Sequence, residues 1–313
     1  MPHPIFPTMK LLSALLLAPL TLFAEEDRLL LVGASYGKNI LAICETDGTV
    51  VWQYKTGGPK VKNNHTGHHD VQFLENGNIL FHDSWSVTSE ITPKREIVWK
   101  HDSKGANVHA FQRLADGNTM IAESGIGRIV HLDKEGQIQK EVPLPKDGRH
   151  QTRMLEILPN GHYLSCAENP GVVTEYDATG KIVWEYPTNT RVFGAIRLKN
   201  GNTLIATGSG NSILEVSPDK KVVWEIAKKI PGTDIELAWT TDLQELPNGN
   251  LVIGNCHAGD KNPQIVEFDK DRKVVWTFDE YELVGNGLAC WEILDAKQTA
   301  LVRSLLKKTS VEK

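Results

Sequence analysis

The sequence predicts an all-β fold, a six-bladed β-propeller with four-stranded blades, and a repeated turn is the main observation behind it. The turn has the pattern Leu-x-Asn/Asp-Gly between two short apolar strands, with Gly77, Gly117, Gly161, Gly201 and Gly249 as its glycines. These glycines are spaced by 40, 44, 40 and 48 residues, and a degenerate sixth copy of the turn is expected at Leu294–Lys297. A period of about 40–50 residues built from short strands is typical of a propeller with one sheet per repeat.

The repeat around Gly201 shows each element of a blade in order. An apolar inner strand runs into Asn200-Gly201, two residues that suit a hairpin because they tolerate positive φ. Three further strands follow, separated by polar or glycine-rich turns. The four expected strands are Val192–Leu198, Thr203–Thr207, Ser212–Val216 and Val222–Ile226.

The outer strand carries a tryptophan in five of the six copies: Trp52, Trp99, Trp184, Trp224 and Trp276. Lys140 takes that place in the third copy. A large ring at one fixed place per repeat is expected to pack between neighbouring blades, because it covers much apolar area. The tryptophans are therefore interpreted as scaffold.

The two ends of the propeller predict how the ring closes. The N-terminal part supplies three strands, Leu29–Val32, Ile40–Cys44 and Val50–Tyr54, and lacks an inner one, while Gly287–Leu294 is an inner strand left over at the C-terminus. Pairing the two would close the ring and hide the sheet edges. We expect one propeller domain over residues 25–303 and a flexible Lys-rich tail over 304–313.

The N-terminus is interpreted as an export signal. Residues 1–24 contain a lysine followed by an apolar stretch too short to span a bilayer comfortably, and a small residue precedes the acidic start of the mature chain. We predict cleavage after Ala24, with Met9 as an alternative start and an uncleaved anchor as the alternative reading. The protein is expected to be secreted or periplasmic, monomeric, and without a stable membrane span after cleavage.

Charge and cysteine content exclude several classes of protein. The net charge of −5 and pI of about 6.1 argue against nucleic-acid binding, which usually requires a basic surface. The four cysteines, Cys44, Cys166, Cys256 and Cys290, contain no CxxC pair, so a zinc framework is not expected. Cys256–Cys290 is the first disulfide to test, and burial of all four as small core residues is the alternative.

Polar residues concentrate on one face, which we call the upper face: it carries the connections between blades and the loops between second and third strands. The position five residues before each turn leucine is expected to point into the central channel. Three neighbouring blades have His69, His109 and Arg153 there, and the others have Phe193, Thr241 and Ala289. Because Arg clamps oxyanions and His is a titratable donor or base, these three are candidate catalytic residues at an anion site.

Other residues of the upper face are candidate ligand-binding residues. Asp70 and Asp242 follow the channel positions and are expected to orient an imidazole. A metal ion held by His68, His69, His109 and Asp70 is possible, although no HxH or HExxH spacing fixes it. The ligand-binding candidates are His68, Asp70, His82, His150, Arg191, Trp239, Asp242, His257 and Trp291.

Two motifs resemble known propeller families. Asp47–Trp52 and Ala178–Trp184 resemble the repeat of quinoprotein-type (PQQ-like) propellers, and His68–Leu80 is similar to the arylsulfotransferase-type propellers. The second resemblance implies an exported six-bladed protein in which a channel histidine, here His69, accepts a sulfuryl group. PQQ itself is not expected as a cofactor, because neither an adjacent cysteine pair nor a calcium cage is evident and PQQ enzymes usually have eight blades.

Two hypotheses of function follow. In the first, the upper face of an exported propeller binds a small anionic or carbohydrate-like ligand, or a protein partner. In the second, an arylsulfotransferase-like enzyme uses His69 as nucleophile, with His109 for proton transfer and Arg153 as sulfate clamp.

Overall fold

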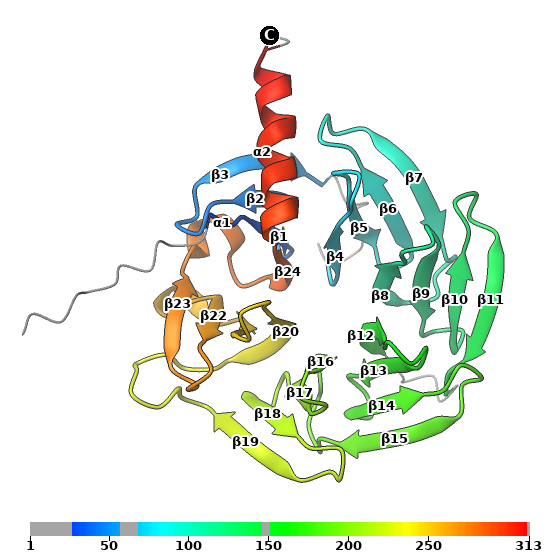
Figure 1. Cartoon of the computed structure of the whole chain (residues 1–313), viewed down its shortest axis with the longest axis vertical. Helices are drawn as coiled ribbons and strands as arrows, with labels where there is room; N and C mark the ends of the chain where they lie inside the picture. The colour runs from blue at the N-terminus through cyan, green and yellow to red at the C-terminus, as the bar shows by residue number, and fades with distance from the viewer. Residues whose placement is uncertain (1–26, 57–67, 146–150, 312–313) are drawn as a thin grey trace, which may run out of the picture.

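Six antiparallel sheets surround a central axis in the structure, a computed structural model that describes residues 27–56, 68–145 and 151–311 (Figure 1). Within these residues, 24 strands give each sheet four members, which confirms the predicted six-bladed propeller. The first blade joins the two ends of the chain in the order β24 (Leu288–Ile293), β1 (Leu30–Ala34), β2 (Ile40–Cys44) and β3 (Val50–Lys55). Leu30 pairs with Ile293, so the ring closes as the sequence predicts.

The other five blades each use four consecutive strands. From inner to outer strand, the second blade consists of β4 (Val71–Phe73), β5 (Ile79–Ser84), β6 (Val87–Ile91) and β7 (Ile97–Asp102), and the third of β8 (Val108–Arg113), β9 (Thr119–Glu123), β10 (Arg128–Leu132) and β11 (Ile138–Pro143). The fourth consists of β12 (Thr152–Ile157), β13 (Tyr163–Ala167), β14 (Val172–Tyr176) and β15 (Ile182–Pro187), and the fifth of β16 (Gly194–Arg197), β17 (Thr203–Ala206), β18 (Ser212–Val216) and β19 (Val222–Ala227). The sixth consists of β20 (Trp239–Glu245), β21 (Leu251–Cys256), β22 (Ile265–Phe268) and β23 (Val274–Phe278).

The turns between inner and second strands lie on the lower face, and their Asn and Gly have different roles. Gly201 has a φ of 87°, a region that glycine enters without steric cost. Asn200 acts through its side chain: its Oδ1 accepts a hydrogen bond from Asn202 N–H (2.9 Å), and its Nδ2 donates to Glu215 (3.0 Å). The turn motif therefore also anchors a carboxylate of the third strand.

The outer-strand tryptophans connect neighbouring blades. The Nε1–H of Trp52 donates to the carbonyl oxygen of Pro93 in the second blade (2.9 Å), and Trp184 donates likewise to Pro218 in the fifth (3.0 Å). Trp276 reaches Thr46 of the first blade (3.3 Å) and so extends the pattern across the ring closure. These contacts confirm that the tryptophans belong to the scaffold.

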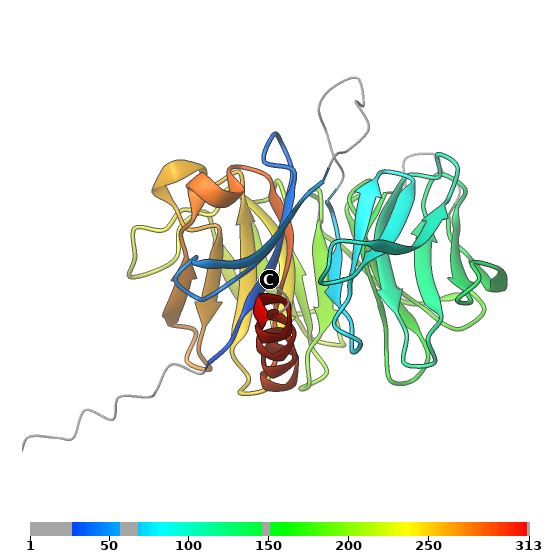
Figure 2. The ribbon, with the colours of Figure 1, turned by 90° about the horizontal axis from the view of Figure 1, so that it is seen from above.

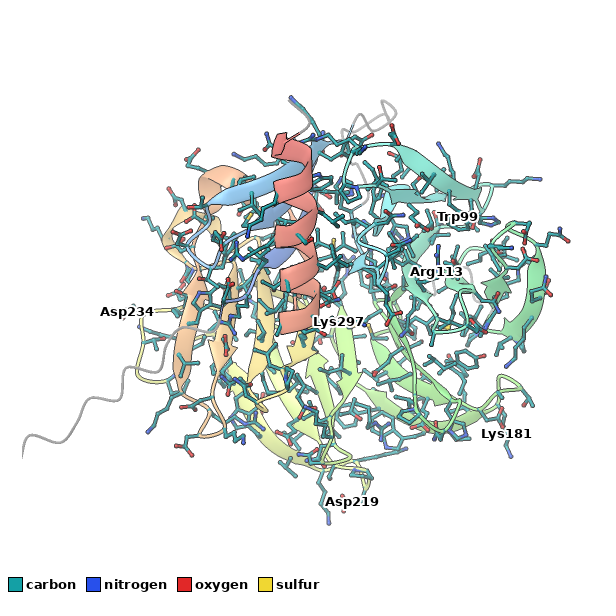
Figure 3. The ribbon with its side chains drawn as sticks, turned by 45° about the horizontal axis from the view of Figure 1, so that its top comes forward. Trp99, Arg113, Lys181, Asp219, Asp234 and Lys297 are labelled. Atoms are coloured by element: carbon teal, nitrogen blue, oxygen red, sulfur yellow. The ribbon has the colours of Figure 1, made fainter. Side chains whose placement is uncertain are left out.

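A buried glutamate faces the tryptophan in four blades. It pairs with an arginine of the next blade, and that arginine lies over the tryptophan ring; Trp99 and Arg113 show the arrangement (Figure 3). The ion pairs are Glu90–Arg113, Glu175–Arg197, Glu215–Arg272 and Glu267–Arg28. A charge buried between blades is tolerated because both its arginine partner and the turn side chains satisfy it; these are asparagines, except that His162 contacts Glu175.

The third blade replaces this arrangement with a different one. His131 occupies the glutamate position opposite Lys140, and Tyr163 of the fourth blade bridges them. Its hydroxyl lies 2.9 Å from His131 Nε2 and accepts a hydrogen bond from Lys140 Nζ (2.9 Å). In this blade, His131, Lys140 and Tyr163 therefore form one hydrogen-bonded group in place of the tryptophan arrangement.

The first blade has Ile43 opposite Trp52, and a C-terminal helix covers this apolar seam. Helix α2 (Ala296–Val311) crosses the lower side of the ring, where Figure 2 shows it end-on. Its buried Val302 and partly buried Leu301 and Leu306 pack on the cluster that contains Ile43 and Trp52. Two short helices, η1 (Gly259–Lys261) and α1 (Tyr281–Val284), complete the described elements.

Helix α2 corrects two predictions. A degenerate turn was expected at Leu294–Lys297 and a flexible tail over 304–313, but the helix begins within the first and continues into the second as far as Val311, where the described residues end. Asp295 accepts a hydrogen bond from Gln298 N–H (2.7 Å), and Gln298 Oε1 accepts one from Asp295 N–H (2.8 Å). This reciprocal pair is a capping box, which begins a helix where a hairpin turn was expected.

All four cysteines are free thiols and buried, so the Cys256–Cys290 disulfide is not formed and the alternative of small core residues holds. Cys256 Sγ lies 3.1 Å from the carbonyl oxygen of Asn286. Across the described ranges, no helix is both long and apolar enough to cross a bilayer. The predicted export signal over residues 1–24 lies outside the described residues.

Candidate functional site

The upper face contains a pocket of about 580 Å³ at the mouth of the central channel. Strand starts and second-to-third-strand loops from five blades contribute to its wall, which is why residues so distant in sequence meet there. Its lining residues are Ser35, Tyr36, His69, Trp85, Arg153, Glu168, Arg191, Phe193, Asn211, Ala238, Trp239, Cys256, His257 and Ala289.

Two guanidinium groups share one carboxylate in this pocket. Arg153 Nε donates to Glu168 Oε2 (2.5 Å), and its Nη2 also pairs with that carboxylate and donates to Gln151 (3.2 Å). Arg191 Nη1 donates to the other oxygen of Glu168 (3.3 Å). Glu168 is nearly buried, with its side chain 5% exposed, whereas Arg191 is 55% exposed. The carboxylate therefore fixes Arg153 and tethers Arg191 at the rim.

Aromatic rings surround these charges. The guanidinium of Arg153 lies over Phe193, 5.3 Å from the ring centroid, and that of Arg191 lies over Trp239 at 6.0 Å. His257 packs against Trp239, with centroids 5.9 Å apart. These rings give the pocket flat apolar walls beside its cationic groups.

His69, which lines the pocket, meets His109 beside it, as their equivalent positions predict. Their rings lie edge to face with centroids 4.7 Å apart, and His69 is 6.3 Å from Phe193. Trp85 packs on His109 at 5.8 Å. The structure thus brings His69, His109 and Arg153 together at one end of the channel.

Three buried nitrogens at this place have no hydrogen-bond partner within the described residues: Arg153 Nη1, His69 Nδ1 and His109 Nδ1. An unpartnered buried polar atom costs about 1–3 kcal/mol, so such atoms are normally satisfied by water or a ligand. Because Arg153 and His69 line the pocket, their two nitrogens are the natural contact points for an oxygen-bearing ligand, while His109 lies behind His69.

Burial sets the protonation of the two imidazoles. The pKa of His69 lies well below its usual range because of burial first, and then because of His109 and the Arg153 cation. Burial and Arg153 lower the pKa of His109 in the same way. Both rings are neutral at pH 7, so each offers one N–H donor and one basic nitrogen.

Asp70 and Asp242 have a different role from the one expected. Asp70 accepts from Phe111 N–H (2.9 Å) and Asp242 from Trp291 N–H (3.1 Å), so each carboxyl joins its inner strand to the next and orients no imidazole. The buried N–H groups of Phe111 and Trp291 need an acceptor, and these two carboxyls supply it. Burial raises the pKa of Asp242 to about 7 and that of Asp70 well above its usual range.

The remaining candidates divide between the pocket and its surroundings. Arg191, Trp239 and His257 line the pocket. The buried His68 lies 2.8 Å from Thr56 Oγ1, and the buried His82 packs on Phe111. Trp291 is also buried and does not line the pocket. His150 lies outside the described residues.

The metal hypothesis gains no support from the structure. In the three described ranges, no group of three or more His, Cys, Asp or Glu side chains is arranged to hold a metal ion. His68 lies within hydrogen-bond distance of Thr56, and Asp70 accepts a hydrogen bond from a backbone N–H. Two of the four residues expected to share an ion, His68 and Asp70, therefore have other partners, while His69 and His109 contact each other.

Sequence reasoning did not single out Glu168, which organises both arginines. Its only signal is its place directly after a second strand, on the same face as the histidines. Phe193 was placed in the channel but not assigned to the site, and Trp85 was not assigned either. A charged residue in a loop is usually solvated, so its burial against two arginines is visible only in three dimensions.

A larger recess of about 800 Å³ lies on the lower face, beside the start of α2. Its charged groups include Asp27, Glu245 and Glu292, and its one arginine, Arg28, is already paired with Glu267. It lacks the combination of unpartnered nitrogens and aromatic walls. The upper pocket is therefore the stronger candidate.

The fold and the pocket define a six-bladed propeller with a cationic, aromatic upper mouth. A family model described as "Outer membrane protein assembly factor BamB" matches residues 169–304. No curated protein sequence matches the chain.

Solved structures share the fold. A protein of unknown function from Bacteroides caccae is 21% identical and superposes with a TM-score of 0.70, over 86% of this chain and 99% of its own. A streptogramin B lyase is 14% identical, with a TM-score of 0.57 over 79% of this chain and 82% of its own. An inactive virginiamycin B lyase from Staphylococcus aureus with quinupristin is 12% identical, with a TM-score of 0.57 over 83% and 87%.

Proposed function

We propose that this protein is an exported propeller that binds a small anionic ligand in its upper pocket. The observation that carries the proposal is Arg153 Nη1, which is buried without a partner among the described residues, while the rest of that guanidinium is held by Glu168 and Gln151. An oxyanion would satisfy it with a charge-assisted hydrogen bond. The N-terminal apolar segment and the matched family, described as an outer membrane protein assembly factor, support export.

The test is calorimetry and thermal shift on the protein beginning at Glu25, with sulfate, phosphate, acetate, glucuronate and glucose as probes. We expect at least one anion to raise Tm and glucose to leave it unchanged. Arg153→Gln should abolish the shift. Because that variant leaves Glu168 unpaired, the double variant Arg153→Gln/Glu168→Gln keeps the charge balanced, and the exposed Lys181→Gln serves as control. Binding that survives in the double variant would overturn the proposal.

A second candidate is sulfuryl transfer, favoured by a neutral His69 with an unpartnered nitrogen beside Arg153. Its basic nitrogen would attack the sulfur of an aryl sulfate, an N–S bond would form as the aryl O–S bond breaks, and the phenolate would leave. The oxygen of an acceptor phenol would then attack the sulfur, the N–S bond would break to regenerate the imidazole, and the acceptor's proton would pass through His109 to solvent and the released phenolate. Turnover of 4-nitrophenyl sulfate with a phenol acceptor, abolished in His69→Gln, would establish this activity, and its absence in the parent protein would eliminate it.

A further inference from the structure

The charges of the upper pocket nearly cancel. Among its described lining residues, Arg153, Arg191 and Glu168 carry full charges, so one carboxylate faces two guanidinium groups. The pKa values of His69 and His257 are lowered by burial, which leaves both rings uncharged at neutral pH. Among the lining residues, at most a single positive charge therefore remains for a ligand.

That remaining charge lies at the rim. Arg153 is 13% exposed and shares two of its nitrogens with Glu168, so the deep part of the pocket is an ion pair with no excess charge. Arg191 is 55% exposed and contacts Glu168 through one nitrogen only. Below the floor lies Asp242, whose pKa burial raises to about 7, so near neutral pH its carboxyl carries part of a negative charge and adds to the repulsion of a second ligand charge.

The shape of the pocket favours a flat ligand. Phe193 and Trp239 each lie under a guanidinium group, and Trp85 lies 6.4 Å from the ring of His69. Planar rings pack well on such walls, where they gain aromatic contacts beyond simple burial of area.

We propose that the pocket selects a flat, unsaturated monoanion, such as an aromatic carboxylate, and rejects a dianion of the same shape, with Glu168 as the residue that sets this limit. This inference rests on the proposed function. One negative charge is matched by the single excess positive charge, while a second charge would be desolvated beside the carboxylate of Glu168 without a partner. Glu168 also turns Arg153 so that Nη1 stays available, which makes it a positioning residue.

The test compares 2-naphthoate, 2-naphthyl phosphate and naphthalene-2-carboxamide by calorimetry. Near pH 7.5 the phosphate is a dianion, because its second pKa is about 6. We expect the parent protein to bind the carboxylate about tenfold or more tightly than the phosphate, and the amide more weakly than the carboxylate. At about pH 5, where the phosphate is a monoanion, the preference over phosphate should shrink.

Glu168→Gln keeps the size of the side chain and removes its charge. We expect it to improve phosphate binding relative to carboxylate by about tenfold or more, while the exposed Glu225→Gln keeps the parent ratio. Thermal unfolding of both variants checks that they are folded. If Glu168→Gln has the parent ratio, or if the parent prefers the dianion or binds neither naphthyl anion, the inference is wrong. The proposed function would still stand if a smaller anion bound in an Arg153-dependent manner.

Discussion

The imidazole of His82 lies edge to face against Phe111, with ring centroids 4.7 Å apart, and both of its ring nitrogens are buried without a hydrogen-bond partner in the described structure. Burial, and then the neighbouring His68, lower the pKa of His82 to about 3. The pKa of His68 falls to about 4 for the same main reason. The folded protein thus buries His82 and His68, and it favours the neutral form of both rings.

Acid should therefore destabilise the protein through these histidines. The folded-state pKa of His82 lies below the unfolded value of about 6.5, so the unfolded state takes up the proton first as pH falls. The stability contribution of the neutral ring is present above about pH 6.5 and is lost progressively towards pH 3. Urea unfolding between pH 7 and pH 4 should show a falling free energy of unfolding.

Replacing the ring should remove part of this loss. We expect His82→Leu to raise the free energy of unfolding by about 1–2 kcal/mol at neutral pH, because no polar atom remains unsatisfied, and by more near pH 4. His257 lies at the pocket rim, where its ring is only partly covered, so His257→Leu should change the pH slope less than His82→Leu. If His82→Leu loses as much stability as the parent between these pH values, the assignment of the acid sensitivity is wrong.

The glutamates between blades should contribute strongly to stability. Glu215 accepts hydrogen bonds from Asn200 (3.0 Å) and Asn202 (2.7 Å) and pairs with Arg272 of the next blade. We expect Glu215→Ala to cost about 3–5 kcal/mol, because it leaves a partly buried guanidinium and two amides without their acceptor. Chemical unfolding measures the loss. The exposed Glu225→Ala of the adjacent outer strand should stay within about 0.5 kcal/mol of the parent, and equal effects would contradict this role.

Helix α2 should protect the seam between the first two blades. Val302 is 3% exposed and Trp52 is 4% exposed, and both belong to one apolar cluster. We expect Val302→Asp to lower the free energy of unfolding by about 2–4 kcal/mol and to increase quenching of tryptophan fluorescence by acrylamide. Ser304→Asp on the exposed side of the same helix should change neither. Unaltered quenching in Val302→Asp would mean that α2 does not shield Trp52.

The four thiols should react only after unfolding. Burial raises the pKa of Cys44, Cys166 and Cys256 to about 12, and all four cysteines are buried and free. Because the thiolate is the reactive species, we expect Ellman's reagent to modify the native protein very slowly and to titrate four thiols in denaturant. Two thiols in denaturant, rising to four after reduction, would show a disulfide instead.

Local patterns explain what was predictable. The Asn-Gly turns, the strands around them and the pairing of the chain ends follow from short-range periodicity, and the equivalent positions of His69, His109 and Arg153 follow from strand register. The start of α2 was mistaken because Asp295 and Gln298 cap a helix at a place where five earlier copies make a turn. Aspartate suits both structures, and here Gln298 three residues later, with Lys297 in place of the turn glycine, favours the helix.

The sequence by itself determined the ring of six blades and the face that collects histidine and arginine, because each depends on residues close together in one repeat. It also determined the closure, because the first repeat lacks an inner strand and the C-terminal part has one left over. Only the tertiary structure decided that Glu168 neutralises Arg153 and holds Arg191, that Asp70 and Asp242 join inner strands, and that the cysteines stay apart. Those outcomes depend on distances between blades. A repeat pattern sets the order of such contacts around the axis, but burial and hydrogen-bond geometry set which groups pair and which remain open to a ligand.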